Sequence, residues 1–389
     1  MFKKYFYACM MSVGHVGSDI NQGALSAIIP FLVAAYHYDY AQVGTLVMFF
    51  CLIGSVVQPM FGALADKHYS PLILPCALLL ASGGMALTTF TDNYILLCVF
   101  VIISGIGVAM FHPVGILIVN KTAPKDAPGT AVSIFATGGS LGFTLGPIAV
   151  GIGTALFGLK GTLLLMVPTF IVIAFLCLKN REINELMDNS SFKKKAKQVA
   201  GGEDNWMAFY KLCGVIFGRS IIFYSLNTFI VLYWMDALGQ SKGLGTTMLS
   251  IFFACGTLST MVCGKIADKV GYRKMIRLSF TTMFPCLLAF CLFQNLYMAS
   301  ILIIPLGLAM NANYSSFVVL SQKYLPNHPG LAGGVSLGLA VSVGGIVTPM
   351  MGHLADNYGL IYVFYAATCI CLIPLISAYI LPPDPVKET

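Results

Sequence analysis

Charged side chains are scarce in this sequence. Asp, Glu, Lys and Arg together make up 10% of its 389 residues, whereas a soluble domain carries about 25%. Hydrophobic residues make up 58%, and the mean hydropathy is +0.84. This number of charged side chains cannot cover the surface of a soluble protein, and the composition therefore predicts an integral membrane protein.

The signatures of common enzymes are also missing. The sequence contains no HExxH motif, no nucleotide-binding loop and no cluster of acidic residues inside an apolar run, and GxSxG occurs only within long apolar runs, at 138–142 and 334–338, rather than at a strand-to-helix turn. An ATP-driven pump needs a nucleotide-binding loop, so we expect neither a membrane-embedded enzyme nor a primary pump.

Metal-binding and disulfide patterns are absent as well. The 12 cysteines form no CxxC pair, and nearly all lie in apolar runs, which favours small buried side chains. We therefore expect no metal ion and no cofactor. The net charge of +7 comes mainly from residues at the ends of apolar runs, so it does not indicate a nucleic-acid partner.

Long apolar runs, by contrast, recur along the whole chain. They are about 20 residues or longer, which is the length a helix needs to cross a bilayer, and they lack the alternation of barrel strands. The sequence predicts an all-α membrane protein with transmembrane helices at residues 5–35, 41–65, 71–90, 94–120, 129–156, 159–178, 208–236, 243–267, 275–293, 297–322, 330–355 and 359–381.

These twelve spans form two halves that repeat each other. The segment GALADK at 62–67 recurs as GKIADK at 264–269, and KTAP at 121–124 recurs as KYLP at 323–326, both at an offset of 202 residues. A constant offset indicates two parallel six-helix repeats around a central cavity, with the site near the bilayer midplane. We predict an N-terminal six-helix bundle at 1–178, a cytoplasmic linker at 179–207 and a C-terminal six-helix bundle at 208–389.

Basic residues fall mainly on one side of the predicted spans. The linker contains KKKAK at 193–197, whereas the opposite side holds only Lys160 and Lys242. Because loops rich in Lys and Arg stay in the cytoplasm, we expect both termini and the linker to be cytoplasmic. The predicted location is the inner, or cytoplasmic, membrane of the cell.

Several motifs resemble the major facilitator superfamily over essentially the whole chain. The segment 62–67 resembles the signature loop of that superfamily, and the second copy is fuller, with Gly264, Asp268, Gly271, Arg273 and Lys274. In the first copy, residues 68–71 read HYSP where the superfamily has a glycine and a basic pair.

A closer resemblance is to the fosmidomycin resistance family of drug exporters. The shared features are His15-x-x-x-Asp19-x-x-Gln22, Gln58-Pro59, Phe111-His112-Pro113, Ser133-Ile134-Phe135, Gly138-Gly139 and Leu145-Gly146-Pro147. A Phe-His-Pro sequence inside a membrane helix is the most distinctive of these. Some family members have an acidic residue after this proline, where this chain has Val114.

Four ionisable residues inside apolar spans mark the predicted site, because a charge at bilayer depth costs roughly 2.5–3.5 kcal/mol and is usually functional. Asp19 is the only acidic residue that we place well inside the membrane, near the middle of the first span. Burial disfavours a charged carboxylate, so Asp19 can load and release protons; its alternative role is a structural hydrogen bond. His15, one turn earlier, can tune Asp19, bind an anionic group or simply pack.

Arg219 and His112 are the other two ionisable residues. Arg219 lies in the seventh span at a depth similar to that of Asp19, as the 202-residue offset indicates. It can bind an anionic substrate, act as the counter-ion of Asp19, or be a structural arginine that extends its charge toward the membrane surface. The resemblance implies that spans 1, 4, 7 and 10 line the cavity, which makes His112 a wall residue, with hinge packing at Pro113 as the alternative.

Neutral polar residues of spans 7 and 10 complete the predicted substrate site. They can supply hydrogen bonds to a substrate or hold helices together, and they are Tyr224, Asn227, Asn311 and Asn313.

Two further sets have structural roles. We expect Asp66 and Asp268 to cap helix N-termini on the cytoplasmic side, so that the gating residues are Gly62, Asp66, Gly264, Asp268 and Arg273. Gly142, Gly146 and Pro147 form a Gly-x-x-x-Gly-Pro sequence, which resembles the exporter motif of the superfamily and predicts close helix packing.

These features predict a secondary transporter. The expected reaction is proton-coupled export of a small drug or anionic metabolite, such as fosmidomycin, by alternating access; the alternative is proton-coupled uptake of an organic anion or sugar. The expected partners are a small-molecule substrate, protons and the lipid bilayer, and the resemblance implies a monomer.

Overall fold

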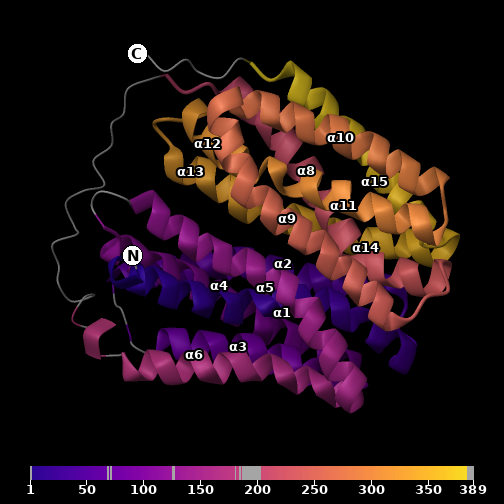
Figure 1. Ribbon diagram of the computed structural model, residues 1–389, viewed down its shortest axis with the longest axis horizontal. Coiled ribbons are helices and arrows are strands. Elements are labelled where there is room, and N and C mark those ends of the chain that lie inside the picture. The colour runs from indigo at the N-terminus through magenta and orange to yellow at the C-terminus, as the bar shows by residue number, and fades with distance from the viewer. Residues whose placement is uncertain are drawn as a thin grey trace. The chain divides into compact units, whose positions relative to one another are not determined.

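The computed structural model describes residues 2–67, 70, 72–124, 128–179, 181–183, 185 and 203–382. Over these residues, the regular structure is helical and includes no strand (Figure 1). The predicted all-α class is therefore confirmed. Ten helical segments of this part of the chain are long and apolar enough to cross a membrane.

The number of spans stays a prediction. The run Thr130–Leu178 counts as one of the ten segments although it covers two predicted spans, and α1 is not among the ten. α1 is rich in glycine, serine and other polar residues, including His15 and Asp19, which explains why it is not counted among the apolar segments.

The helices cluster into two compact units. The first unit comprises Met1–His37 and Phe49–Gln198, and the second comprises Tyr38–Met48 and Val199–Thr389; we call them the first and second bundles. Most of the predicted linker 179–207 lies outside the described residues. The helices of the first half of the chain are α1 (Phe6–Tyr36), α2 (Tyr40–Lys67), α3 (Ile73–Leu87), α4 (Tyr94–Thr122), α5 (Pro128–Phe157) and α6 (Met166–Leu178).

The second half has more interruptions. Its helices are α8 (Trp206–Leu232), α9 (Lys242–Val270), α10 (Tyr272–Leu292), α11 (Leu296–Ala312), α12 (Tyr314–Tyr324), α13 (Pro329–Gly333), α14 (Ala340–Tyr358) and α15 (Ile361–Ile380). The predicted span 297–322 is broken at Asn313, between α11 and α12. Two π-helical stretches, Tyr233–Ala237 and Gly334–Leu339, follow α8 and precede α14.

Side-chain capping fixes the start of several helices. The carboxamide of Asn93 accepts hydrogen bonds from the amides of Ile95 and Leu96 at the start of α4, and Asn205 caps α8 in the same way. The N-terminus of α2 is capped by a residue distant in sequence: Asp356 accepts the Tyr40 and Ala41 amides at 2.8 and 2.9 Å. A carboxylate stabilises the positive end of a helix dipole.

The internal repeat is visible in matching contacts within each bundle. A Cβ on Gly62 would lie 3.5 Å from Pro113, and a Cβ on Gly264 would lie 3.5 Å from Ser315. Both members of the second pair are 202 residues beyond those of the first. The repeat therefore extends from sequence motifs to the packing of α2 on α4 and of α9 on α12.

Candidate functional site

The first bundle brings together three ionisable side chains inside its membrane-spanning helices. His15 and Asp19 lie one turn apart on α1, and Nε2 of His15 is 3.2 Å from Oδ2 of Asp19. Both residues are buried, with 8% and 4% of their surfaces exposed. Because an unpaired charge is costly at such a depth, this pairing explains how α1 accommodates a carboxylate.

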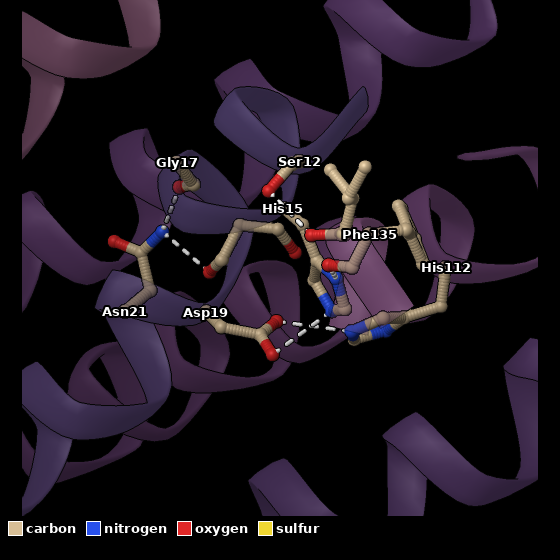
Figure 2. A network of polar contacts seen from close by, with 9 residues as sticks. Ser12, His15, Gly17, Asp19, Asn21, His112 and Phe135 are labelled. Atoms are coloured by element: carbon tan, nitrogen blue, oxygen red, sulfur yellow. Dashed lines mark hydrogen bonds and ion pairs between the residues drawn. The ribbon is translucent and has the colours of Figure 1, made fainter. Parts of the chain in front are cut away.

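His112 completes the cluster from α4. Its Nε2 lies 3.0 Å from Oδ1 of Asp19, and its ring meets the His15 ring edge to face, with 4.8 Å between the ring centroids. Figure 2 shows both imidazoles directed at the two carboxylate oxygens. Sequence reasoning placed His112 on the cavity wall and did not foresee its contact with Asp19. We call these three residues the His–Asp–His cluster.

The His15 ring is fixed from its other side by α5. Its Nδ1 lies 2.8 Å from the carbonyl oxygen of Phe135, and since a carbonyl oxygen only accepts, Nδ1 carries a proton. Nε2 then faces Asp19 either as a donor of a charged imidazolium or as an acceptor from a protonated carboxyl group. The His15–Asp19 contact therefore holds one exchangeable proton in addition to the proton on Nδ1.

The second carboxylate oxygen of Asp19, Oδ1, has weaker hydrogen-bonding partners than Oδ2. Oδ1 of Asp19 is buried and has no well-aligned hydrogen-bond donor among the described residues, although Nε2 of His112 is within ion-pair distance. Pro113 follows His112 inside α4, and a proline in a helix removes a backbone donor and softens the helix at that point. A small adjustment of α4 would therefore align or separate this pair.

Glycines of α5 make room for the cluster. A Cβ on Gly139 would stand 2.6 Å from Nε2 of His15, one on Gly142 would stand 2.8 Å from the Ile20 amide nitrogen, and one on Gly146 would stand 2.5 Å from that of Ala24. Only glycine fits at these distances, so α5 lies directly against α1 at the depth of Asp19. Pro147 lies next in α5, within the same Gly-x-x-x-Gly-Pro sequence.

The neighbouring helices α3, α5 and α6 add no charge to the His–Asp–His cluster. Within their bounds, α3, α5 and α6 contain no Asp, Glu, His, Lys or Arg. The three ligand atoms of His15, Asp19 and His112 lie within 4.8 Å of one another. This spacing is close enough for the three groups to share a small cation, and a proton is the cation that the sequence predicts there.

The second bundle holds Arg219 in a different environment. On α8, its Nε donates to the Met310 carbonyl at 2.8 Å and its Nη2 donates to Oδ1 of Asn311 at 2.9 Å. The guanidinium also lies over the rings of Phe223 and Tyr314, 5.6 and 6.0 Å from their centroids. Among the described residues, no carboxylate lies within salt-bridge distance of Arg219.

The other predicted substrate residues have different surroundings. Asn227 is buried on α8, and its Oδ1 has no hydrogen-bond donor among the described residues. Tyr224 packs against Gly344 of α14. Asn313 is fully buried and donates to Oγ of Ser279 on α10 at 2.8 Å. Of these four neutral residues, Asn311 accepts a hydrogen bond from Arg219, and Tyr224 lies close enough to interact with its charge.

The predicted gating residues lie in the last two turns of α2 and of α9 and in the first turn of α10. Asp268 accepts a hydrogen bond from the hydroxyl of Tyr272 at 2.7 Å, and Arg273 is the second residue of α10. Asp66 belongs to the last turn of α2, but its side chain lies outside the described residues. The capping role of the two aspartates stays a prediction.

Sequence reasoning gave no site role to two residues that shape the cluster. Phe135 contributes its backbone carbonyl, which every residue possesses, so no sequence signal could identify it. Gly139 could have been found, because Gly138, Gly139, Gly142 and Gly146 recur at helical spacing and mark one closely packed face of α5.

Comparisons with known proteins agree with this architecture. The family model described as Major Facilitator Superfamily matches residues 11–349 and 212–389. The chain is 24% identical to the fosmidomycin resistance protein of Escherichia coli, over 96% of this chain and 92% of that protein. It is 25% identical to the multi-drug resistance efflux pump PmrA of Streptococcus pneumoniae, over 94% of this chain and 95% of the pump.

Solved structures show the same fold. A bacterial homolog of the human lysosomal transporter Spinster superposes with a TM-score of 0.80 at 14% identity, over 98% of this chain and 97% of that chain. The nucleoside transporter NupG superposes with a TM-score of 0.74 at 13% identity, over 96% of this chain and 99% of that chain. The chain therefore belongs to the major facilitator superfamily and is a multi-pass membrane transporter, not an enzyme.

Proposed function

We propose that this transporter exports a small drug or anionic metabolite, such as fosmidomycin, in exchange for protons. The observation that carries the proposal is the His–Asp–His cluster, a buried carboxylate between two imidazoles in the first bundle. Buried ionisable groups in transporters commonly form proton relays. The printed names of two relatives, a fosmidomycin resistance protein and a multi-drug efflux pump, support export of a drug-like molecule.

The cluster offers a physical route from a proton to a movement. Its contacts join α1 to α4 through Asp19 and His112, and α1 to α5 through His15 and Phe135. Protonation of Asp19 removes the charge that attracts the two imidazoles. The His112 contact then weakens next to the soft point at Pro113, so that α4 can change its bend. Alternating access would use this change to favour one orientation of the carrier.

In this proposal both termini are cytoplasmic, the carrier is a monomer in the inner membrane, and the external proton load drives export. The residue roles keep their predicted division: Asp19 and His15 carry protons, while Arg219 and its neighbours bind substrate. The gating residues Gly62, Asp66, Gly264, Asp268 and Arg273 close the cytoplasmic side. Gly142, Gly146 and Pro147 keep α5 against α1.

The decisive experiment measures fosmidomycin transport in inside-out vesicles with an imposed pH gradient. We expect gradient-driven accumulation by the wild type and none by Asp19→Asn, because the amide cannot release a proton. Asp92→Asn is the matched control, since Asp92 is exposed in the loop before α4. Full gradient-driven transport by Asp19→Asn would refute the coupling role.

Transport direction is tested with the same preparation. Proton-coupled uptake, the alternative, predicts accumulation in right-side-out vesicles with an inward proton gradient and none in inside-out vesicles. A susceptibility screen of an exporter-deficient strain, with and without this protein, gives an independent answer. Resistance to fosmidomycin or another compound supports export, and no change against any compound favours uptake.

A further inference from the structure

The His–Asp–His cluster has the donor set of a transition-metal site. Zn²⁺ and similar divalent ions are bound by imidazole nitrogens and carboxylate oxygens, and sites with three such ligands keep at least one position open. One ligand atom from each of His15, Asp19 and His112 lies within 4.8 Å of the other two. In the part of the chain that the structure describes, no other three His, Cys, Asp or Glu side chains come together in this way.

The separations between the ligand atoms are close to those around a single ion. Nε2 of His15 is 3.2 Å from Oδ2 of Asp19, and Nε2 of His112 is 3.0 Å from Oδ1 of the same carboxylate. Two ligand atoms that are each about 2.1 Å from a tetrahedral ion lie about 3.4 Å apart. A shift of roughly 1 Å therefore brings all three ligands around one ion, and the soft point of α4 at Pro113 allows His112 to make that shift.

The far side of His15 is held as it is in metal sites. Its Nδ1 donates to the Phe135 carbonyl at 2.8 Å, and histidines that bind metals almost always donate their other ring N–H to an oxygen of this kind. The Phe135 ring also stacks on the imidazole, with 4.2 Å between the two centroids. Figure 2 shows the ring held in this way with Nε2 directed at Asp19. The ligand nitrogen of His15 is therefore oriented before an ion arrives.

The carboxylate of Asp19 has an oxygen that the protein itself uses poorly. Oδ1 is buried and has no well-aligned donor among the described residues, whereas buried polar atoms nearly always have a partner. This oxygen faces His112, whose side chain is 20% exposed, compared with 6% for that of Asp19. The most exposed member of the cluster thus lies next to the unsatisfied oxygen, so movement of His112 opens a path for an ion and for a water molecule that completes its coordination.

The charge of the cluster also favours a cation. With both imidazoles neutral, the cluster carries the single negative charge of Asp19, and the neighbouring helices α3, α5 and α6 contain no Lys or Arg within their bounds. An uncompensated buried charge is costly, so a bound divalent ion is stabilised here. The expectation that the chain binds no metal ion rested on its cysteines, whereas this donor set comes from His and Asp on two different helices, α1 and α4.

We propose that the His–Asp–His cluster is a binding site for a divalent transition-metal ion of the Zn²⁺ type. His15 and His112 bind the ion through Nε2, Asp19 binds it through its carboxylate, and the ion takes the place of the exchangeable proton. Because its ligands come from α1 and α4, a bound ion holds these two helices in one arrangement. The proposal goes beyond the proposed function, since it depends on the geometry of the cluster and not on its use in proton coupling.

The test titrates the purified protein, free of any affinity tag and in detergent, with Zn²⁺ in competition with a fluorescent chelator. We expect one tightly bound Zn²⁺ ion per chain and no comparable binding of Mg²⁺, which prefers oxygen ligands. His112→Phe keeps an aromatic ring but removes the ligand nitrogen. It should weaken Zn²⁺ binding about a hundredfold or more, because loss of an outer partner alone costs about 10- to 100-fold. Asp19→Asn should lose the tight site as well.

His328→Phe is the matched control. His328 is exposed, and its Nδ1 lies 2.8 Å from a carboxylate oxygen of Asp204, so the variant removes a histidine from a second His–Asp pair. It should leave the tight Zn²⁺ site unchanged, and the size-exclusion profile of each variant shows that it remains folded. Equal loss of Zn²⁺ affinity in His112→Phe and His328→Phe, or binding of Zn²⁺ no tighter than that of Mg²⁺, would overturn the proposal.

The metal site and the proposed function fail separately. The titration uses neither a membrane nor a gradient, so Zn²⁺ can bind tightly to a carrier whose export is not driven by protons. Conversely, proton-driven export by a wild type that binds no Zn²⁺ would refute the metal site and leave the coupling role of Asp19 intact.

Discussion

The two bundles use the same scaffold for opposite electrostatic purposes. In the first, α1 and α4 meet through a carboxylate that contacts two imidazoles. In the second, α8 and α11 meet through a guanidinium that contacts a carbonyl and an amide. His112 and Tyr314 occupy equivalent positions of the 202-residue repeat: one contacts the anion, the other flanks the cation. The comparison teaches that one scaffold can hold a buried carboxylate between imidazoles in one bundle and a guanidinium between neutral acceptors in the other.

The largest effect on transport should come from exchanging the side chains at the two equivalent positions, His112 and Tyr314. His112→Tyr removes one imidazole from Asp19, and breaking one side of a buried charge pair costs a few kcal/mol. We expect gradient-driven export to fall about a hundredfold or more, on the order of the rate change for that energy. Tyr314→His should keep proton coupling, because among the described residues no carboxylate contacts Arg219. Equal loss of coupling in both variants would contradict the division of roles.

The glycine contacts give the next largest effect, on stability. A Cβ at Gly142 would stand 2.8 Å from the Ile20 amide nitrogen, and one at Gly344, its equivalent in the repeat, would stand 2.7 Å from the Ser220 carbonyl oxygen. A Cβ at Gly264, by contrast, would lie 3.5 Å from the side chain of Ser315. We therefore expect Gly142→Ala and Gly344→Ala each to lower the melting temperature in detergent by several degrees, and Gly264→Ala to lower it much less. Equal losses in all three variants would mean that the close approach of the helix backbones does not stabilise either bundle.

A smaller effect should follow from removing one of the two hydrogen bonds that hold the Arg219 guanidinium. Asn311→Ala removes one neutral acceptor from Arg219 while keeping the Met310 carbonyl. Because a hydrogen bond to a charged group contributes about 1.5–3 kcal/mol and water can replace part of it, we expect the fosmidomycin concentration for half-maximal transport to rise several-fold. Proton-driven coupling should persist at saturating substrate. Unchanged affinity would show that Asn311 does not position Arg219.

The smallest effect concerns a contact at the start of α8. Asp204 accepts from the Asn327 amide at 3.1 Å and lies 2.8 Å from Nδ1 of His328. Burial raises the pKa of Asp204, but these hydrogen bonds outweigh it and hold the pKa below its ordinary value. The unfolded chain therefore binds this proton more tightly, so Asp204 stabilises the fold above the ordinary pKa and loses its contribution as the pH falls through the lowered value.

Thermal unfolding of Asp204→Asn against the wild type checks this sign. We expect a slightly lower melting temperature for the variant at neutral pH and a difference that shrinks as the pH falls toward 4 and below. A difference that grows in acid would show that the contact does not depend on the charge of Asp204. The His–Asp–His cluster should be unaffected, since it belongs to the other bundle.

The repeat explains how far sequence reasoning reached. The apolar runs predicted helices, which the structure confirms, whereas the similar depth of Arg219 and the His15–Asp19 turn, taken from the 202-residue offset, stays a prediction. Helical spacing alone was enough to place His15 and Asp19 on one face of α1. The break at Asn313 was not foreseen, because an asparagine inside an apolar run does not by itself stop a helix; in the structure, its side chain donates to Ser279.

The sequence by itself determined that this protein is helical, membrane-embedded, internally repeated and equipped with a few buried ionisable groups. These properties follow from composition, run length and spacing, which are local quantities. Only the tertiary structure decided that His112 contacts Asp19, that the Phe135 carbonyl fixes the tautomer of His15, and that Asn311 and Met310 hold Arg219. The reason is geometric: each contact joins residues on different helices, and a helix face is chosen by packing, through glycines that allow the backbones to approach, rather than by the order of residues along the chain.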